Sequence, residues 1–214
     1  MGYAATATGR STLAASLACM LVLAWPYPAR AQDAALPQAD DFMIEAMVTG
    51  VNPATGRDGS TFAVRAYLGA ERTRIDLHMP EAEDAYLIVD NDSGNGWVIS
   101  KDSDAALPIS TDSYRELVVD PQAPCARMRV SCQPLGHRDI AGVRAQGLRY
   151  SGARGRGPGA SDRGQMWFDP ASGLVVSYEA RTRDRKTRRM RATEVRREPL
   201  PPALFELPTA LQPR

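Results

Sequence analysis

Few residues of this 214-residue chain suggest covalent or acid–base chemistry. Cys125 and Cys132 are the first candidates, but they are spaced more widely than the Cys-x-x-Cys pairs typical of redox centres. The nearest histidine in the sequence is His137, and no cluster of further ligands accompanies it. The spacing therefore favours a structural disulfide between Cys125 and Cys132, with a redox pair or a metal site as the alternatives.

Catalytic motifs are absent from the sequence. It has no Gly-x-Ser-x-Gly, no glycine-rich phosphate loop followed by a strand–helix pattern and no paired-cysteine metal motif. His78 falls on the polar side of a predicted strand and His137 follows a Pro-Leu-Gly turn, so both are expected at the surface. The many carboxylates do not single out a glycosidase pair. We therefore expect a protein that is not an enzyme and that uses no cofactor or metal.

The first 31 residues have the pattern of a secretory signal peptide. Arg10 precedes the apolar run Leu13–Trp25, and Ala29-Arg30-Ala31 follows as a small-x-small cleavage site. The run is shorter than the roughly 20 residues that span a bilayer. We expect cleavage after Ala31 and a periplasmic product, and this oxidising compartment also favours the disulfide. The alternative is a lipoprotein anchored at Cys19.

The rest of the chain predicts one β domain over residues 42–208, between a mobile leader at 32–41 and a C-terminal tail at 209–214. Alternating apolar and polar residues indicate strands with one buried and one solvated face, and their close spacing indicates an antiparallel meander. By contrast, Lys101–Pro134 lacks this periodicity and contains several prolines, so we expect loops and short helix there. The predicted strands are Phe42–Thr49, Thr61–Leu68, Arg72–Met79, Ala85–Asp90, Trp97–Ser100, Val143–Tyr150, Gln165–Asp169, Leu174–Thr182 and a last strand that follows the Arg181–Arg191 run and continues to Val195.

Charge is distributed unevenly along the chain. Residues 32–120 hold 17 acidic and 6 basic side chains, whereas residues 121–214 hold 8 acidic and 18 basic ones. This asymmetry indicates either contact with a polyanion or membrane surface, or two halves of one sheet that pair with each other. The glycine- and arginine-rich stretch Ser151–Arg163 is interpreted as a hairpin loop and not as a nucleic-acid contact.

A second basic stretch lies between two predicted strands near the C-terminus. We interpret it either as a solvated hairpin tip whose charges guard a sheet edge, or as a surface that docks an acidic protein or an anionic membrane. Its basic residues are Arg181, Arg183, Arg185, Lys186, Arg188, Arg189 and Arg191.

Two motifs near the C-terminus resemble the LolA-like group of exported bacterial proteins. WFDPASGLVVSYEA begins at Trp167, and EPLPPALFELP ends at Pro208; the stretches FMIEAMVTG and ERTRIDLHM are similar to the start of those proteins. The resemblance implies a single, strongly curved antiparallel sheet of about ten or eleven strands. In this open half-barrel, short helices lie on a concave side that is apolar and, in the carriers LolA and LolB, takes acyl chains.

From this resemblance we expect a monomeric, non-enzymatic periplasmic protein that shelters an acyl chain or another lipidic ligand, in lipid or lipoprotein trafficking. The alternative is an envelope interaction module that docks through the Arg181–Arg191 hairpin. Flexible methionines suit irregular apolar ligands, although such residues are also ordinary core. The residues expected to line the apolar pocket are Met43, Met47, Met79, Trp97, Trp167 and Phe205.

Overall fold

The structure is a computed structural model that describes residues 41–51, 56–78, 84–102, 105–110 and 117–209. The expected signal peptide with Cys19, Met79, and nearly all of the expected leader and C-terminal tail lie outside the described residues. None of the helical segments in the described part has the length and hydropathy that a bilayer-spanning helix needs.

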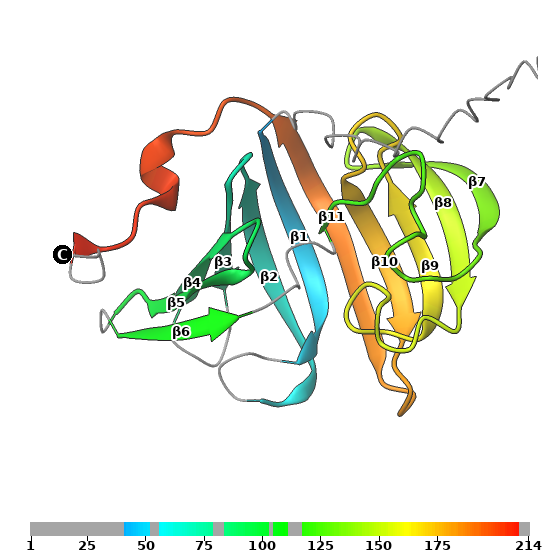
Figure 1. Cartoon of the computed structure of the whole chain (residues 1–214), viewed down its shortest axis with the longest axis horizontal. Helices are drawn as coiled ribbons and strands as arrows, with labels where there is room; N and C mark the ends of the chain where they lie inside the picture. The colour runs from blue at the N-terminus through cyan, green and yellow to red at the C-terminus, as the bar shows by residue number, and fades with distance from the viewer. Residues whose placement is uncertain (1–40, 52–55, 79–83, 103–104, 111–116, 210–214) are drawn as a thin grey trace, which may run out of the picture. The chain divides into compact units, whose positions relative to one another are not determined.

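The described chain forms one eleven-stranded antiparallel sheet, in the order β6-β5-β4-β3-β2-β1-β11-β10-β9-β8-β7 (Figure 1). Two meanders, β1–β6 and β7–β11, join where the first and last strands pair, and β6 and β7 remain as edges. This open sheet confirms the predicted fold. The strands are β1 (Phe42–Val51), β2 (Asp58–Leu68), β3 (Arg72–His78), β4 (Ala85–Asp90), β5 (Asn95–Ser100), β6 (Ala106–Ser110), β7 (Gln133–Ile140), β8 (Val143–Ser151), β9 (Arg163–Phe168), β10 (Val175–Arg181) and β11 (Thr187–Arg197).

Two strands, β6 and β7, were not predicted. Both are edge strands that are largely solvent-exposed, so they lack the alternating burial that marks the other strands. In β7 the register shifts between Pro134 and Gly136, and Gly136 has a φ of +84°. Such a bulge interrupts the pattern further. His137, which was placed after a turn, is an exposed residue of β7.

The expected short helices on the concave side are wrong for the described residues. Residues 121–129 form successive turns, and the 3₁₀ helix η2 (Pro202–Phe205) packs against β3 instead. Proline in a helix interior removes a hydrogen bond and clashes with the preceding turn. Pro121 and Pro124, with a disulfide closing the segment from Cys125, leave too little free chain for a helix to propagate.

The core is concentrated on β1 and β8–β11. The largest group of buried side chains includes Ala46, Leu148, Met166 and Met190, which the strand register places on one side of the sheet. We call the side of the sheet that carries these four residues the inner face, and the opposite side the outer face. A second cluster centres on Phe42, Ile44, Trp167, Leu174 and Val176.

Candidate functional site

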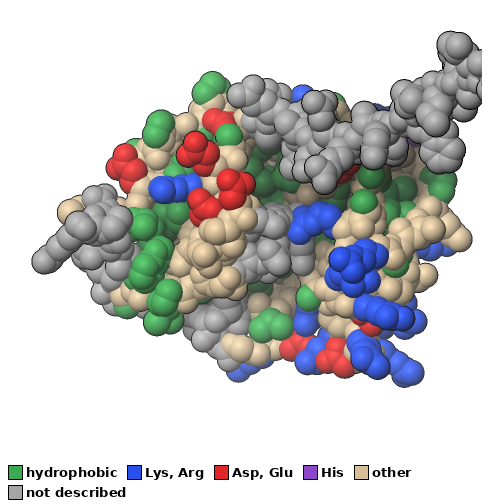
Figure 2. Space-filling model, in the orientation of Figure 1, with side chains coloured by type: hydrophobic (Ala, Val, Ile, Leu, Met, Phe, Trp, Pro, Cys, Tyr) green, Lys and Arg blue, Asp and Glu red, His purple; other side chains and the backbone are tan. Residues whose placement is uncertain are grey.

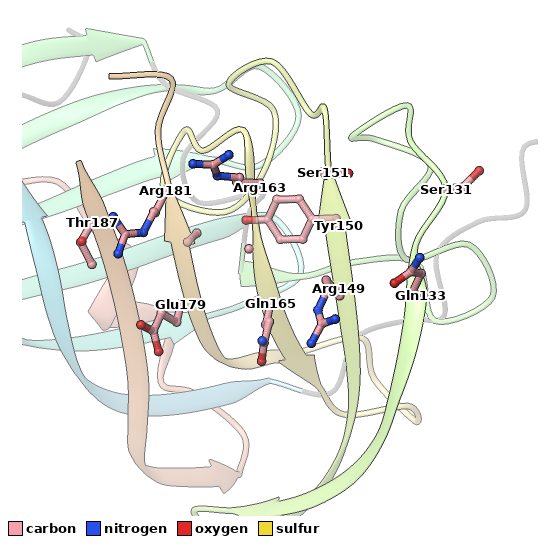
Figure 3. Close-up of a pocket in the computed structure, with 12 residues that line it drawn as sticks. Ser131, Gln133, Arg149, Tyr150, Ser151, Arg163, Gln165, Glu179, Arg181 and Thr187 are labelled. Atoms are coloured by element: carbon pink, nitrogen blue, oxygen red, sulfur yellow. The ribbon is translucent and has the colours of Figure 1, made fainter. Parts of the chain in front are cut away.

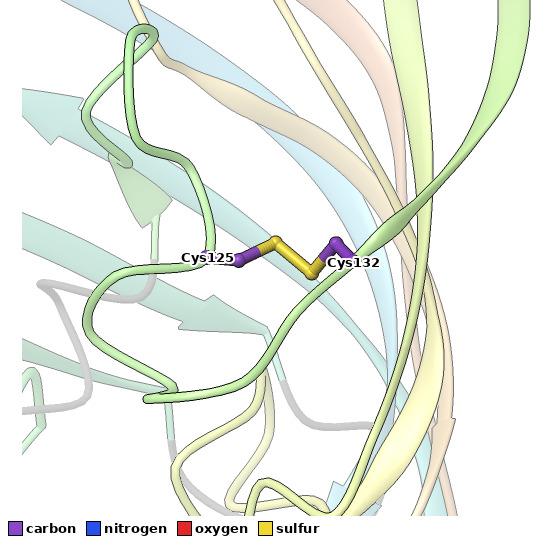
Figure 4. The surroundings of a disulfide bond; sticks show 2 residues. All are labelled: Cys125 and Cys132. Atoms are coloured by element: carbon purple, nitrogen blue, oxygen red, sulfur yellow. A yellow bond between two sulfur atoms is a disulfide. The ribbon is translucent and has the colours of Figure 1, made fainter.

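The inner face over β8–β11 is filled by the chain's own segment Leu117–Cys132. Val119, Cys125 and Met128 of this segment are buried in the same cluster as Met166 and Phe168. Figures 1 and 4 show the segment lying against the curved strands. Cys125 and Cys132 form a disulfide with a Cα–Cα distance of 6.3 Å, which confirms the predicted pairing. This half of the inner face is therefore covered by the chain's own side chains.

The inner face over β2–β6 is different, because an apolar row runs across it toward the edge. Direct cross-strand pairs connect the row from the centre of the sheet to β6. The central alanine is 1% exposed, the next three side chains are half-buried, and the leucine at the edge is 68% exposed. In order, the row consists of Ala66, Ile75, Leu87, Val98 and Leu107.

The buried side chains beside the row, on the same face of β2–β4, include Phe62, Leu77 and Val89. Phe62 and Leu77 form a small cluster, with half-buried Val64 and Ala85 against it. Figure 2 shows hydrophobic side chains gathered on the half of the molecule that holds β3–β6. The row thus forms an apolar, partly exposed surface that ends at a sheet edge.

The residues predicted to line the pocket mostly lie on the outer face. Successive side chains of a strand point to opposite faces, so Met43 and Met47 lie on the other side of β1 from Ile44. The register extends the Met43 row to Trp97. Met43 is 4% and Met47 44% exposed, and Trp97 is half-buried. The structure therefore spreads these residues along one face and does not gather them into one pocket.

Trp167 and Phe205 have structural contacts of their own. Trp167 is 6% exposed and covers Gly147, where an added Cβ would come within 2.3 Å of its ring, while the Arg138 guanidinium lies 4.3 Å from the ring centroid. Phe205 packs on Gly69, and its carbonyl accepts a 3.0 Å hydrogen bond from Arg72. Their predicted ligand role remains a prediction.

The basic hairpin between β10 and β11 is partly neutralised. Arg188 and Lys186 contact Asp58 at 2.6 and 3.2 Å, and Arg189 contacts Glu179 at 2.8 Å. Burial opposes ionisation of Asp58, but hydrogen bonds from Arg188 and Lys186 outweigh it and hold the pKa of this carboxyl below its usual value. Within the described residues, four exposed arginines of the hairpin form no ion pair: Arg181, Arg183, Arg185 and Arg191.

The acidic and basic halves of the sequence hardly pair with each other. Among the ion pairs of the described chain, those of Asp58 connect residues 32–120 to residues 121–214. The remaining pairs lie within one half, such as Arg65 with Glu45 and Arg197 with Asp169. In Figure 2, acidic side chains gather on the side of β3–β5 and basic ones on the side of the β10–β11 hairpin. The charge asymmetry is thus a feature of the surface.

A hollow of about 470 Å³, lined mainly by polar and charged residues, lies over β7–β11 (Figure 3). Arg149, Arg163 and Arg181 contribute guanidinium groups from β8, β9 and β10. Alternation places these three on the outer face, because their neighbours Leu148 and Ala180 belong to the buried cluster of the inner face. No group of three or more His, Cys, Asp or Glu side chains in the described chain could hold a metal ion.

Comparisons with known proteins concern the fold. A scan against protein-family models and a search of curated proteins found no match. Among solved structures, an uncharacterised conserved protein from Thermus thermophilus superposes with a TM-score of 0.53 at 12% identity, over 81% of this chain and 89% of that one. At this identity the likeness shows the fold alone.

Two other solved structures have lower TM-scores. The Pseudomonas aeruginosa MucA/MucB complex gives a TM-score of 0.47 at 13% identity, over 83% of this chain and 60% of that chain. A LolA superfamily protein, NE2245 from Nitrosomonas europaea, gives 0.37 at 12% identity, over 80% of this chain and 91% of that one.

Sequence reasoning missed both the apolar row and the arginine hollow. Ile75, Leu87 and Val98 were visible as apolar strand positions, but their alignment across three strands depends on the register. Arg149, Arg163 and Arg181 are dispersed over three strands. Arg163 ended the stretch interpreted as a hairpin loop, and Arg181 began the basic hairpin. No local sequence signal brings either set together.

Proposed function

We propose that this protein is an exported, non-enzymatic binding protein that shelters an acyl chain or another lipidic ligand on its inner face over β3–β6. The observation that carries the proposal is the apolar row that ends at Leu107, which is 68% exposed. Contiguous exposed apolar surface on a folded protein usually marks a binding site. An acyl chain laid along the row would gain about 0.8 kcal/mol for each methylene that it buries.

The division of the inner face supports the same site. The Leu117–Cys132 segment occupies the half over β8–β11, so the half over β3–β6 is where a ligand can contact apolar strand residues. The row opens toward β6, an edge that no further strand covers in the described sheet. The resemblance of the sequence to LolA-like proteins implies a lipidic ligand, and the signal-peptide pattern and the disulfide support export.

The test compares two apolar-to-acidic substitutions on opposite faces. Leu107→Glu introduces a charge at the exposed end of the inner row, and Met47→Glu introduces one at a 44% exposed position on the outer face. Uptake of a fluorescent fatty acid should weaken about tenfold in Leu107→Glu, because lost burial of a leucine costs about 1.5–3 kcal/mol. Met47→Glu should bind as the unchanged protein does.

Native mass spectrometry of the mature protein from an envelope extract identifies the natural ligand. A bound species that organic extraction removes is the expected result. A bare protein that also takes up no fatty acid would reject the proposal. Loss of uptake in Met47→Glu alone would instead assign the ligand to the outer-face residues predicted from the sequence.

A further inference from the structure

In the outer-face hollow, a cross-strand row places two positively charged side chains directly opposite each other. Arg163 of β9 lies directly opposite Arg181 of β10, and the row continues to Ser151 on one side and Thr187 on the other. Directly opposed residues of an antiparallel pair have Cβ atoms about 4.5–5.5 Å apart, and like charges at this distance are destabilising. A strand pair that keeps two arginines there therefore carries an uncompensated repulsion.

The described ion pairs leave both arginines without a carboxylate partner. In the described chain, neither Arg163 nor Arg181 forms an ion pair, and the same holds for Arg149 in the adjacent row. The acid that lines the hollow, Glu179, contacts Arg189 at 2.8 Å and is itself 68% exposed. The hollow thus combines three unneutralised guanidinium groups with one carboxylate that already has a partner.

We propose that this hollow binds a phosphate-bearing group. Guanidinium forks match the geometry of phosphate oxygens and donate paired, charge-assisted hydrogen bonds. Phosphate carries more charge than a single carboxylate, so it offsets the repulsion between Arg163 and Arg181 better than an acidic side chain would. The hydroxyl of Ser151 and the amide of Gln165 add neutral donors at the same surface.

The rigidity of the site also favours a small, defined ligand. Arg149, Arg163 and Arg181 lie on three adjacent, hydrogen-bonded strands whose inner side is packed by the disulfide-tied segment. Their spacing is therefore set by the sheet. By contrast, Arg183 and Arg185 of the hairpin tip lie in the turn between β10 and β11. The three arginines of the hollow thus lie on paired strands, whereas the two arginines of the tip lie in a turn.

This proposal goes beyond lipid binding on the inner face and does not depend on it. The hollow and the apolar row lie on opposite faces of the sheet and over opposite halves of it. Leu107→Glu, which tests the inner row, should leave phosphate binding unchanged. Failure of one proposal therefore leaves the other standing.

The test uses calorimetry with inorganic phosphate and pyrophosphate, and sedimentation with vesicles of phosphatidylglycerol or phosphatidylcholine, at low salt. The variant is the Arg163→Gln, Arg181→Gln double substitution, and the matched control is Arg183→Gln, Arg185→Gln at the hairpin tip. Both remove two positive charges. Affinity should fall about tenfold or more in the first variant, because each charge-assisted hydrogen bond is strong, and change little in the control.

The probes separate the two sources of the phosphate group. If the protein binds the free anions and the Arg163→Gln, Arg181→Gln variant does not, the ligand is a soluble phosphate. If it binds only phosphatidylglycerol vesicles and the same variant does not, the ligand is a lipid head group. Absence of binding to every probe overturns the proposal. Equal loss of binding in both variants also overturns it.

Discussion

The two ends of the sheet differ in what covers their inner face. Over β8–β11, the Leu117–Cys132 segment packs into a cluster of twelve buried residues. Over β2–β6, Phe62 of β2 and Leu77 of β3 form a small cluster, and the apolar row becomes more exposed toward Leu107. One continuous sheet therefore has one end whose inner face is covered by the chain's own segment and another end whose inner face becomes exposed at the β6 edge.

On the outer face, the covered half and the open half of the sheet are exchanged. Over β3, η2 and the chain around it are held by hydrogen bonds from Arg72 and Arg74 to the carbonyls of Phe205 and Leu204. Over β8–β10, the outer face instead carries the arginine hollow. Each half of the sheet is thus covered by the chain's own segment on one face, and its other face holds one of the two proposed sites.

The largest expected effect is the loss of stability when a side chain is truncated at the end covered by the Leu117–Cys132 segment. Phe168 is fully buried at the centre of the cluster, so Phe168→Ala should lower the free energy of unfolding by about 3–5 kcal/mol. Leu107→Ala, at the open end, should change it by less than about 0.5 kcal/mol. Urea unfolding of both variants measures the difference. Similar losses at the two positions would mean that the ends are equally packed.

The disulfide gives the next largest effect. Replacing Cys125 and Cys132 together by Ala should lower the free energy of unfolding by about 2.5 kcal/mol, because the open loop regains chain entropy when unfolded. Fatty-acid uptake by the folded variant should be retained, since the proposed row lies over the other half of the sheet. If the variant lost uptake while still folded, the two halves of the inner face would not be independent.

A smaller effect concerns how stability depends on pH. It arises at Asp169, which follows β9 and contacts Arg197 of β11. Asp169 is 7% exposed, accepts a 2.6 Å hydrogen bond from Ser172 and contacts Arg197. Burial opposes its ionisation, but the bonds from Ser172 and the Ala171 amide, with the charge of Arg197, hold its pKa below the usual value. Because the folded-state pKa is lowered, the carboxylate stabilises the fold above the ordinary aspartate pKa. This stabilisation is lost as the pH falls through the lowered value.

Asp169→Asn should therefore lower the free energy of unfolding by about 1–3 kcal/mol at pH 7. Its deficit relative to the unchanged protein should shrink as the pH falls below about 4, near the ordinary aspartate pKa. Urea unfolding at both pH values measures the change. Asp139→Asn is the control, because Asp139 and its partner Arg144 are each 71% exposed and such pairs contribute little. A deficit that stays constant with pH would show that Asp169 acts through packing alone.

Much of the fold could be predicted because it depends on local pattern. Alternation in Phe42–Val51 and the turn sequences at Gly69 and Asn91–Gly96 indicate strands and tight connections without reference to distant residues. The pairing of Cys125 with Cys132 followed from their closeness in the chain and is confirmed. The edge strands β6 and β7 were missed because exposed strands lack alternating burial.

By itself, the sequence determined the strand pattern, the disulfide and the unequal charges of the two halves, since each is read from neighbouring residues. Only the tertiary structure decided which side chains share a face. It placed Met43 and Met47 opposite the inner row, aligned Leu87 with Val98, and brought Arg163 against Arg181. The physical reason is that a sheet's surface is set by strand register, and a shift of one residue moves every side chain to the other face.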